Sequence, residues 1–165
     1  MSAKQYNVLI LCTGNSARSI LGEVLFNALG KGKFKAYSAG SKPAGQVNPD
    51  ALEWLTKNGY RTDGLCSKSW DEFATPEAPE FDFIFTVCDN AAGESCPLWP
   101  GKPATAHWGI PDPALVKGDE ARRTAFNRAA EQLARRIGLF LSLPIEKLDK
   151  LTLKEKLAEI GHIRD

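Results

Sequence analysis

Short apolar runs alternate with longer amphipathic stretches along this chain of 165 residues. The apolar runs are typical of strands buried on both faces, and the stretches between them have helical spacing. We expect strands over roughly residues 6–11, 34–39, 81–87 and 104–108. We expect helices over roughly residues 17–29, 48–58 and 119–140, with a short helical turn at 69–73. This alternation predicts an α/β fold, a three-layer αβα arrangement around a four-stranded parallel sheet.

The end of the chain extends beyond this pattern, with two further short helices expected at roughly 145–148 and 152–160. Several of their apolar residues have helical spacing and predict an apolar stripe. These residues are Leu148, Leu151, Leu153, Leu157 and Ile160. We therefore expect a main domain over residues 1–141 and a helical extension, 142–165, that packs on it. The alternative is that the stripe forms a dimer contact.

Composition and charge narrow the class of protein. The formal net charge of +1 gives no sign of binding to nucleic acid or to an anionic membrane surface. We find no basic-then-apolar leader and no apolar stretch long enough to span a membrane, so we expect a cytoplasmic protein. Four cysteines in such a compartment favour reactive chemistry over structural disulfides. Their spacing is not that of a zinc site, and we expect no metal cofactor.

The most informative segment joins the first predicted strand to the first predicted helix. It consists of Cys12, Thr13, Gly14, Asn15, Ser16, Ala17, Arg18 and Ser19. Unpaired amides and the helix dipole make such a turn an anion site. Gly14 and Asn15 tolerate the backbone conformations that turn successive amides inward.

Two side chains of this segment add chemistry to the anion site. Arg18 offers a planar fork that grips two oxygens of one anion, and the electropositive surroundings should lower the pKa of the Cys12 thiol. Ser19 is placed to donate its hydroxyl to that sulfur. The segment thus predicts a nucleophilic thiol that attacks a tetrahedral oxyanion. The plainer interpretation is a buried cysteine that ends a strand before an ordinary helix cap.

A second pair of cysteines follows the third predicted strand. Cys88 ends the strand, and Cys96 lies in the same segment of small and polar residues. Turn-forming residues between them would let the chain fold back to disulfide distance. We interpret them as a redox pair. The alternatives are a core residue at Cys88 and an incidental residue before Pro97 at Cys96.

A third candidate is Asp112, which lies between Pro111 and Pro113 after the fourth predicted strand. The prolines stiffen its backbone, and a carboxylic acid held there can protonate a leaving oxygen. A plain turn is the alternative. Because the carboxyl ends of parallel strands meet at one edge of a sheet, Cys12, Cys88 and Asp112 should share that edge.

Together these residues resemble the low-molecular-weight protein tyrosine phosphatase superfamily, and more closely its thioredoxin-coupled arsenate reductases. The resemblance covers roughly residues 6–141. It rests on Cys12 to Ser19, Ser38-Ala39-Gly40, Thr86-Val87-Cys88, Cys96-Pro97, His107-Trp108-Gly109 and Asp112-Pro113. It implies the phosphatase-like fold and an enzyme that binds arsenate or phosphate in the 13–19 loop.

The resemblance also implies a relay of three thiols. Cys12 would attack arsenate held by Arg18, while Asp112 protonates the departing hydroxyl. Cys88 would then attack Cys12 and release arsenite, and Cys96 would attack Cys88. Thioredoxin or another dithiol donor would reduce the resulting Cys88–Cys96 disulfide.

Two other functions remain open at this point. The first is a phosphatase acting on phosphotyrosine, which would use the same Cys12, Arg18 and Asp112. Against it, Ala114 follows Asp112-Pro113, where the phosphatases usually carry an aromatic residue. The second is an oxyanion-binding redox sensor without turnover.

Some members of the family that this chain resembles bind potassium near the loop. The residues that match their potassium ligands here are Asn15, Glu23 and Ser38. We hypothesise that the Lys68 ammonium takes the place of that cation. Cys66 matches no role and is interpreted as a spare thiol.

Overall fold

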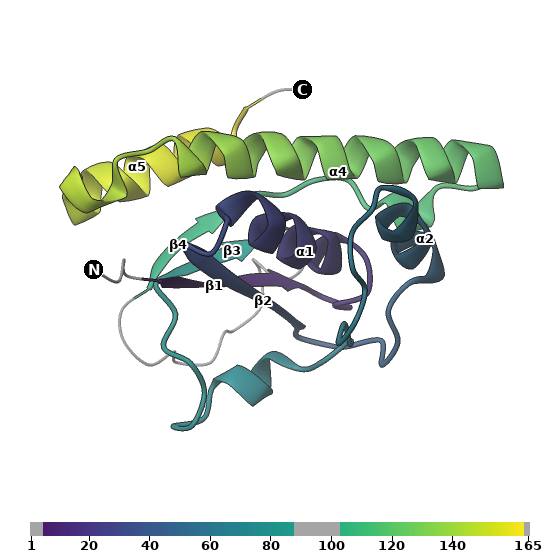
Figure 1. Cartoon of the computed structure of the whole chain (residues 1–165), viewed down its shortest axis with the longest axis horizontal. Helices are drawn as coiled ribbons and strands as arrows, with labels where there is room; N and C mark the ends of the chain where they lie inside the picture. Colours follow the sequence, from purple (N-terminus) through teal and green to yellow (C-terminus); the bar gives the residue numbers. More distant parts are fainter. Residues whose placement is uncertain (1–4, 88–102, 164–165) are drawn as a thin grey trace.

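Four parallel strands form the centre of the structure, a computed structural model that describes residues 5–87 and 103–163 (Figure 1). Their order across the sheet is β2-β1-β3-β4. Their bounds are Tyr6–Cys12 for β1, Phe34–Gly40 for β2, Phe83–Thr86 for β3 and Ala104–His107 for β4. The predicted α/β class and the four-stranded parallel sheet are confirmed. Cys88 and Cys96, the predicted redox pair, lie outside the described residues.

The helices also fall where the sequence predicts them. Among the described residues, the α-helices are α1 Arg18–Gly30, α2 Pro49–Lys57, α4 Asp119–Leu141 and α5 Lys150–Gly161. The same part of the chain also contains short 3-10 helices, η1 Trp70–Phe73, η2 Pro113–Leu115 and η3 Ile145–Lys147, of which η2 is not predicted from the sequence. The Asn48 side chain caps α2 by accepting from the amide of Asp50 at 2.8 Å, as an Asn-Pro start predicts.

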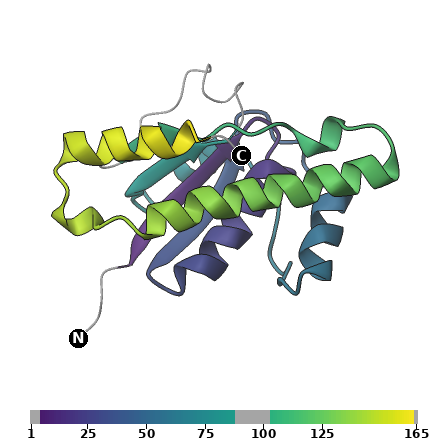
Figure 2. The same cartoon turned by 90° about the horizontal axis from the view of Figure 1, so that it is seen from above.

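The two faces of the sheet are covered differently. Val8 and Ile10 of β1 point into the larger core, which α1, α2, α4 and α5 close. Leu9 and Leu11 point to the opposite face, where the segment around η1 forms a smaller core with Trp70. Figures 1 and 2 show α4 crossing above α1, and Figure 2 shows α5 running back beside α4. The main helical layer therefore lies on one face.

The carboxyl ends of the strands meet at one edge. Cys12 is level with Gly40 in β2, and Thr86 in β3 is level with His107 in β4. The chain runs from β1 to β2 on one side and then crosses over to β3 on the other side of β1, so strand order reverses beside β1. Parallel α/β sheets bind ligands at such a reversal. The fold thus places the loop after Cys12 at the favoured position.

The C-terminal helix α5 packs along β4, one of the two edge strands of the sheet. Leu157 and Ile160 are buried in the larger core, whereas Leu151 remains 68% exposed. The predicted stripe is therefore buried in part. The division into a domain over 1–141 and an extension over 142–165 stays a prediction. Within the described residues, no helix is long and apolar enough to cross a membrane.

Candidate active site

Cys12 ends β1 with its side chain buried beneath the loop that leads to α1. Its Sγ lies 2.9 Å from the Oγ of Ser19 and accepts a hydrogen bond from the backbone amide of Asn15 at 3.2 Å. Cys12 is 3% exposed and Ser19 is fully buried. A sulfur that faces donors on two sides is suited to carry negative charge, because hydrogen bonds to a charged form favour it.

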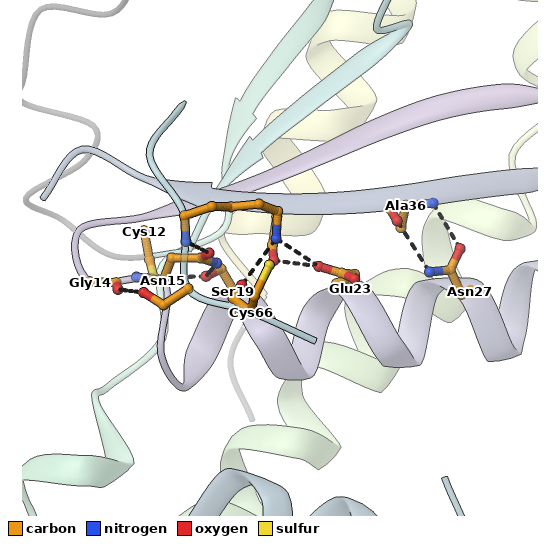
Figure 3. A network of polar contacts seen from close by, with 11 residues as sticks. Cys12, Gly14, Asn15, Ser19, Glu23, Asn27, Ala36 and Cys66 are labelled. Carbon is orange, nitrogen blue, oxygen red and sulfur yellow. Dashed lines mark hydrogen bonds and ion pairs between the residues drawn. The ribbon is translucent and has the colours of Figure 1, made fainter. Parts of the chain in front are cut away.

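Asn15 links three parts of this site (Figure 3). Its backbone has a φ of 45°, the left-handed conformation that asparagine tolerates. Its Nδ2 donates to Ser19 Oγ at 2.8 Å, and its Oδ1 accepts from the backbone amide of Lys68 at 2.9 Å. Since Ser19 Oγ already accepts this bond, its own hydrogen is available for the sulfur of Cys12. Asn15 is therefore the hub that orients the serine hydroxyl.

The loop carbonyls are held from outside by the segment that follows β2. The amide-to-carbonyl pairs are Lys42 to Thr13, Ala44 to Gly14 and Asn48 to Ser16, each at 2.9 Å. Ser67 Oγ adds a second donor to the Gly14 carbonyl at 3.0 Å. Because these carbonyls point outward, the amides of the loop face its inner side. This is the arrangement of an anion-binding nest.

Gly40 supports the same loop by its lack of a side chain. A Cβ at this position would lie 3.0 Å from both the amide nitrogen of Asn15 and the carbonyl oxygen of Cys12. It would also collide with the carbonyl oxygen of Thr13. From the sequence Gly40 is only the end of a strand, and its close approach to the loop becomes visible in three dimensions.

Arg18 and Asp112 come together from different elements, α1 and the loop after β4. Arg18 Nη1 donates to the carbonyl of Ile110 at 3.0 Å, and its Nη2 lies 3.4 Å from Asp112 Oδ2. Both side chains are partly exposed. A guanidinium carries five N–H donors, so these two contacts orient Arg18 and leave donors for an anion.

Asp112 has a structural contact as well. Its Oδ1 accepts from the amide of Ala114 at 3.0 Å, which caps η2. The sequence predicts a plain turn or a catalytic acid here, and the structure places a capped 3-10 helix with one carboxylate oxygen toward Arg18. Leu115 of the same helix is 78% exposed.

Glu23, Ser38 and Lys68 form a second polar group behind Asn15. Ser38 Oγ donates to Glu23 Oε1 at 2.5 Å, and Lys68 Nζ lies 3.9 Å from the same oxygen. Lys68 Nζ also donates to the carbonyl of Cys66 at 3.1 Å. Burial raises the pKa of the Glu23 carboxyl, and the Ser38 hydrogen bond and the Lys68 charge oppose that rise.

These contacts bear on the potassium site of some relatives, to which Asn15, Glu23 and Ser38 correspond. The Asn15 and Glu23 oxygens already accept hydrogen bonds, and an ammonium lies beside Glu23. The Lys68 ammonium beside Glu23 disfavours a potassium ion there, because the two cations would repel each other. Over residues 5–87 and 103–163, no group of three or more His, Cys, Asp or Glu side chains is arranged to hold a metal ion.

Several contacts of the site carry no signal in the sequence. The carbonyl of Ile110 and the amide of Lys68 hold Arg18 and Asn15, yet any residue type supplies a backbone atom. Thr86 Oγ1 and His107 Nδ1, at the ends of β3 and β4, lie 2.6 Å apart, a pair that sequence reasoning missed. Cys66 is exposed and keeps no assigned role.

Comparison with known proteins gives a consistent result. Residues 7–154 match the family described as low molecular weight phosphotyrosine protein phosphatase. The arsenate reductase of Halalkalibacterium halodurans is 33% identical over 134 residues, which cover 81% of this chain and 93% of that protein.

Solved structures show the same fold. An arsenate reductase from Archaeoglobus fulgidus is 31% identical with a TM-score of 0.60, over 79% of this chain and 98% of that one. A low molecular weight protein tyrosine phosphatase from T. tengcongensis is 23% identical with a TM-score of 0.65, over 87% and 100%. At that lower identity the likeness shows the shared fold alone.

Proposed function

Since this chain belongs to the low molecular weight phosphotyrosine protein phosphatase family, we propose that it is an enzyme that reduces arsenate to arsenite. The observation that carries the chemistry is the Cys12 sulfur beneath the amide loop, with donors from Asn15 and Ser19. Identity of about one third with arsenate reductases selects this reaction over ester hydrolysis.

Binding of the oxyanion is assigned to the loop and to one side chain. The loop residues are Thr13, Gly14, Asn15, Ser16, Ala17, Arg18 and Ser19. Their amides form the cradle, and the remaining N–H groups of the Arg18 guanidinium bind the outer oxygens. The outward carbonyl contacts support this proposal because they fix the loop before the anion arrives.

The first chemical step forms a bond between sulfur and arsenic. The Cys12 thiolate attacks the arsenic atom, and one hydroxyl of arsenate leaves. Asp112 gives its proton to that hydroxyl, which departs as water. The approach of Asp112 to Arg18 supports this role because both groups then face the same anion. The product is a Cys12 thiol–arsenate adduct.

The following steps transfer electrons from sulfur to arsenic. The Cys88 thiolate attacks the Cys12 sulfur, an S–S bond forms, and the S–As bond breaks. Arsenic keeps the electron pair and leaves as arsenite, reduced by two electrons. The Cys96 thiolate then attacks Cys88, which frees the Cys12 thiolate and leaves a Cys88–Cys96 disulfide.

A dithiol donor is required to return that disulfide to two thiols. We propose thioredoxin or a similar protein dithiol, since its reduction potential lies near −270 mV, low enough to reduce a labile disulfide. Such a relay needs a reducing compartment, and we propose the cytoplasm.

The test separates the relay from the oxyanion chemistry. Cys88→Ser and Cys96→Ser are assayed for arsenate-dependent NADPH oxidation with thioredoxin and its reductase, and for hydrolysis of an aryl phosphate. Both variants should lose arsenate turnover and retain hydrolysis. Cys66→Ser, which removes an exposed thiol, is the matched control and should retain both. Arsenate turnover that survives in both relay variants would contradict the proposal.

Hydrolysis of phosphate esters is proposed as a side activity. Phosphate and arsenate share shape and charge, so the same cradle and Cys12 accept a phosphoryl group. The family description supports this activity. Ala114 beside Asp112 offers no aromatic wall for a substrate ring, which favours weak turnover of aryl esters.

We also infer that the Lys68 ammonium takes the place of the potassium ion that some relatives bind, and supplies the positive charge beside Glu23. Its position beside Glu23 and the Cys66 carbonyl supports this. The wild-type protein should show equal arsenate turnover in KCl and in NaCl at equal ionic strength, whereas Lys68→Met should gain activity from KCl. A strong potassium dependence of the wild type would contradict the inference.

A further inference from the structure

The end of helix α5 lies directly against the chain that leaves β4. Gly161, the last residue of α5, faces the backbone of His107, and a Cβ on it would collide with the His107 carbonyl oxygen. The same Cβ would lie 3.0 Å from Cδ1 of Trp108. Neither neighbour can move away easily, because the His107 oxygen belongs to the backbone and the Trp108 ring is buried. The contact therefore requires glycine.

Trp108 makes a second link to the same helix. Its indole Nε1 donates to the carbonyl of Leu157 at 3.0 Å, within the buried core. The indole is 1% exposed and stacks on Phe85 with ring centroids 3.8 Å apart. The tryptophan is thus clamped between β3 and α5, so its backbone has little freedom to shift.

The backbone after Trp108 leads to the site within two residues. Trp108 donates its amide to the Thr86 carbonyl at 2.7 Å, and Ile110 donates its amide to the Val87 carbonyl at 3.2 Å. The carbonyl of Ile110 then accepts from Arg18 Nη1 at 3.0 Å. A displacement at Trp108 would therefore move the acceptor that orients the Arg18 guanidinium.

We propose that α5 is a positioning element of the active site. Gly161 and the Leu157 carbonyl fix the chain from His107 to Ile110, and through Ile110 they set the orientation of Arg18 toward the oxyanion. Both contacts come from residues beyond 154, where the match to the family ends. The proposal rests on the proposed function only in taking Arg18 as an anion-binding residue.

The test measures binding of inorganic phosphate to the whole chain by isothermal titration calorimetry, well below the melting temperature. In Gly161→Ala the methyl group pushes α5 from His107, and the dissociation constant for phosphate should rise about fivefold or more, because small displacements of a binding group have large effects. Gly138→Ala is the matched control. Gly138 also lies in a helix, and a Cβ there meets no atom within 4 Å. This variant should bind phosphate as the wild type does.

A second variant and a stability control separate positioning from folding. Trp108→Phe keeps a stacked ring but removes the indole donor to Leu157 together with part of the buried ring volume, and its dissociation constant for phosphate should rise as well. Phe34→Leu removes buried ring contacts at the opposite end of the sheet. It should lower the stability of the protein and leave the dissociation constant for phosphate unchanged.

The outcomes distinguish the two proposals. A wild-type protein that binds no phosphate overturns the proposed function. Wild-type phosphate affinity in folded Gly161→Ala overturns the positioning role, and so does wild-type affinity in Trp108→Phe if the first variant does not fold.

Discussion

Aromatic rings fill the amino end of the sheet, whereas buried polar side chains surround Cys12 at the carboxyl end. At the amino end, Phe140 of α4 meets Phe34 and Phe83 edge to face at centroid distances of 5.3 and 4.9 Å. At the carboxyl end, Asn15 and Ser19 are fully buried and hydrogen-bonded to each other and to the loop.

The two ends depend on different physical terms. Rings are held by burial and dispersion, which are non-directional and tolerate small shifts. The polar end is held by directional hydrogen bonds, and each partner that is lost leaves a buried group unsatisfied. Changes at the amino end should therefore lower stability with little effect on chemistry. Changes at the carboxyl end should impair the chemistry, and they also cost stability wherever a buried group loses its partner.

The largest effect should come from Cys12→Ser. The substitution is nearly isosteric, but a serine hydroxyl does not ionise near neutral pH and is a far weaker nucleophile. Arsenate reduction and aryl phosphate hydrolysis should both fall to background, while the melting temperature changes little. Residual turnover of either substrate above that of a protein-free control would show that another group attacks the oxyanion.

Phe140→Ala should have the largest effect on stability. Phe140 is fully buried, and its ring contacts Phe34, Phe83 and Trp108. Truncation of a buried phenylalanine costs about 3–5 kcal/mol. The measurement is chemical denaturation, with hydrolysis assayed at a temperature where the variant is folded. Turnover per folded molecule should stay close to that of the wild type.

The neighbouring residue supplies the control for that measurement. Leu139 precedes Phe140 on α4 but is 39% exposed. Leu139→Ala should therefore change the unfolding free energy by about 0.5 kcal/mol or less. Equal losses in the two variants would mean that the aromatic cluster does not hold this end of the sheet.

The same contrast explains what the sequence predicts. The sequence predicts the strands and α-helices to within a few residues, because apolar runs and helix caps are side-chain signals. The Asn48-Pro49 start of α2 was identified in this way. The same signal at Asp112-Pro113 predicts either a stiffly held catalytic acid or a plain turn, and in the structure it opens η2. A short helix and a turn share their first residues, so the pattern did not separate them.

The sequence predicts which residues lie at the active-site edge of the sheet, but it does not predict the hydrogen bonds that hold them there. Because parallel strands end together, Cys12 and the Asp112 loop were expected at one edge, and the structure places both there. The contacts that hold them run through backbone atoms of Ile110 and Lys68, which have no residue-type signature. Gly161 gives no signal either, since its close neighbour lies far away in sequence.

Asn15→Ala tests the comparison between the two ends near a single helix, because Asn15 lies just before α1 and Asn27 lies further along it. It removes the bonds to Ser19 Oγ and from the Lys68 amide and places alanine at a φ of 45°. Stability should fall by about 1–3 kcal/mol, since buried groups lose their partners. Arsenate turnover should fall about tenfold or more, because the hydroxyl that faces Cys12 loses its orientation.

Asn27→Ala is the matched control for this loss. Asn27 lies further along α1, and its side chain also makes two bonds, both to the backbone of Ala36 (Figure 3). Its removal should lower stability and leave turnover unchanged. Equal losses of turnover in the two variants would mean that Asn15 acts through stability alone.

The smallest effect concerns the pH dependence that Glu23 gives to stability. Burial raises the pKa of this carboxyl above its ordinary value of 4.5 in the folded state. The folded protein therefore binds more protons than the unfolded chain as pH rises above about 4.5. Under this linkage the contribution of Glu23 to the unfolding free energy is largest at low pH and is lost as pH rises through the raised pKa.

Glu23→Gln should remove that contribution while it keeps an acceptor for Ser38. The unfolding free energy of the wild type, measured relative to the variant by urea denaturation, should decrease as pH is raised from 4.5 toward neutrality. Glu155→Gln, at an exposed position of α5, should show no such trend. If the wild type instead gains stability relative to Glu23→Gln as pH rises, the charge of Lys68 outweighs burial. The carboxyl end of the sheet would then be held by an ion pair rather than by neutral hydrogen bonds.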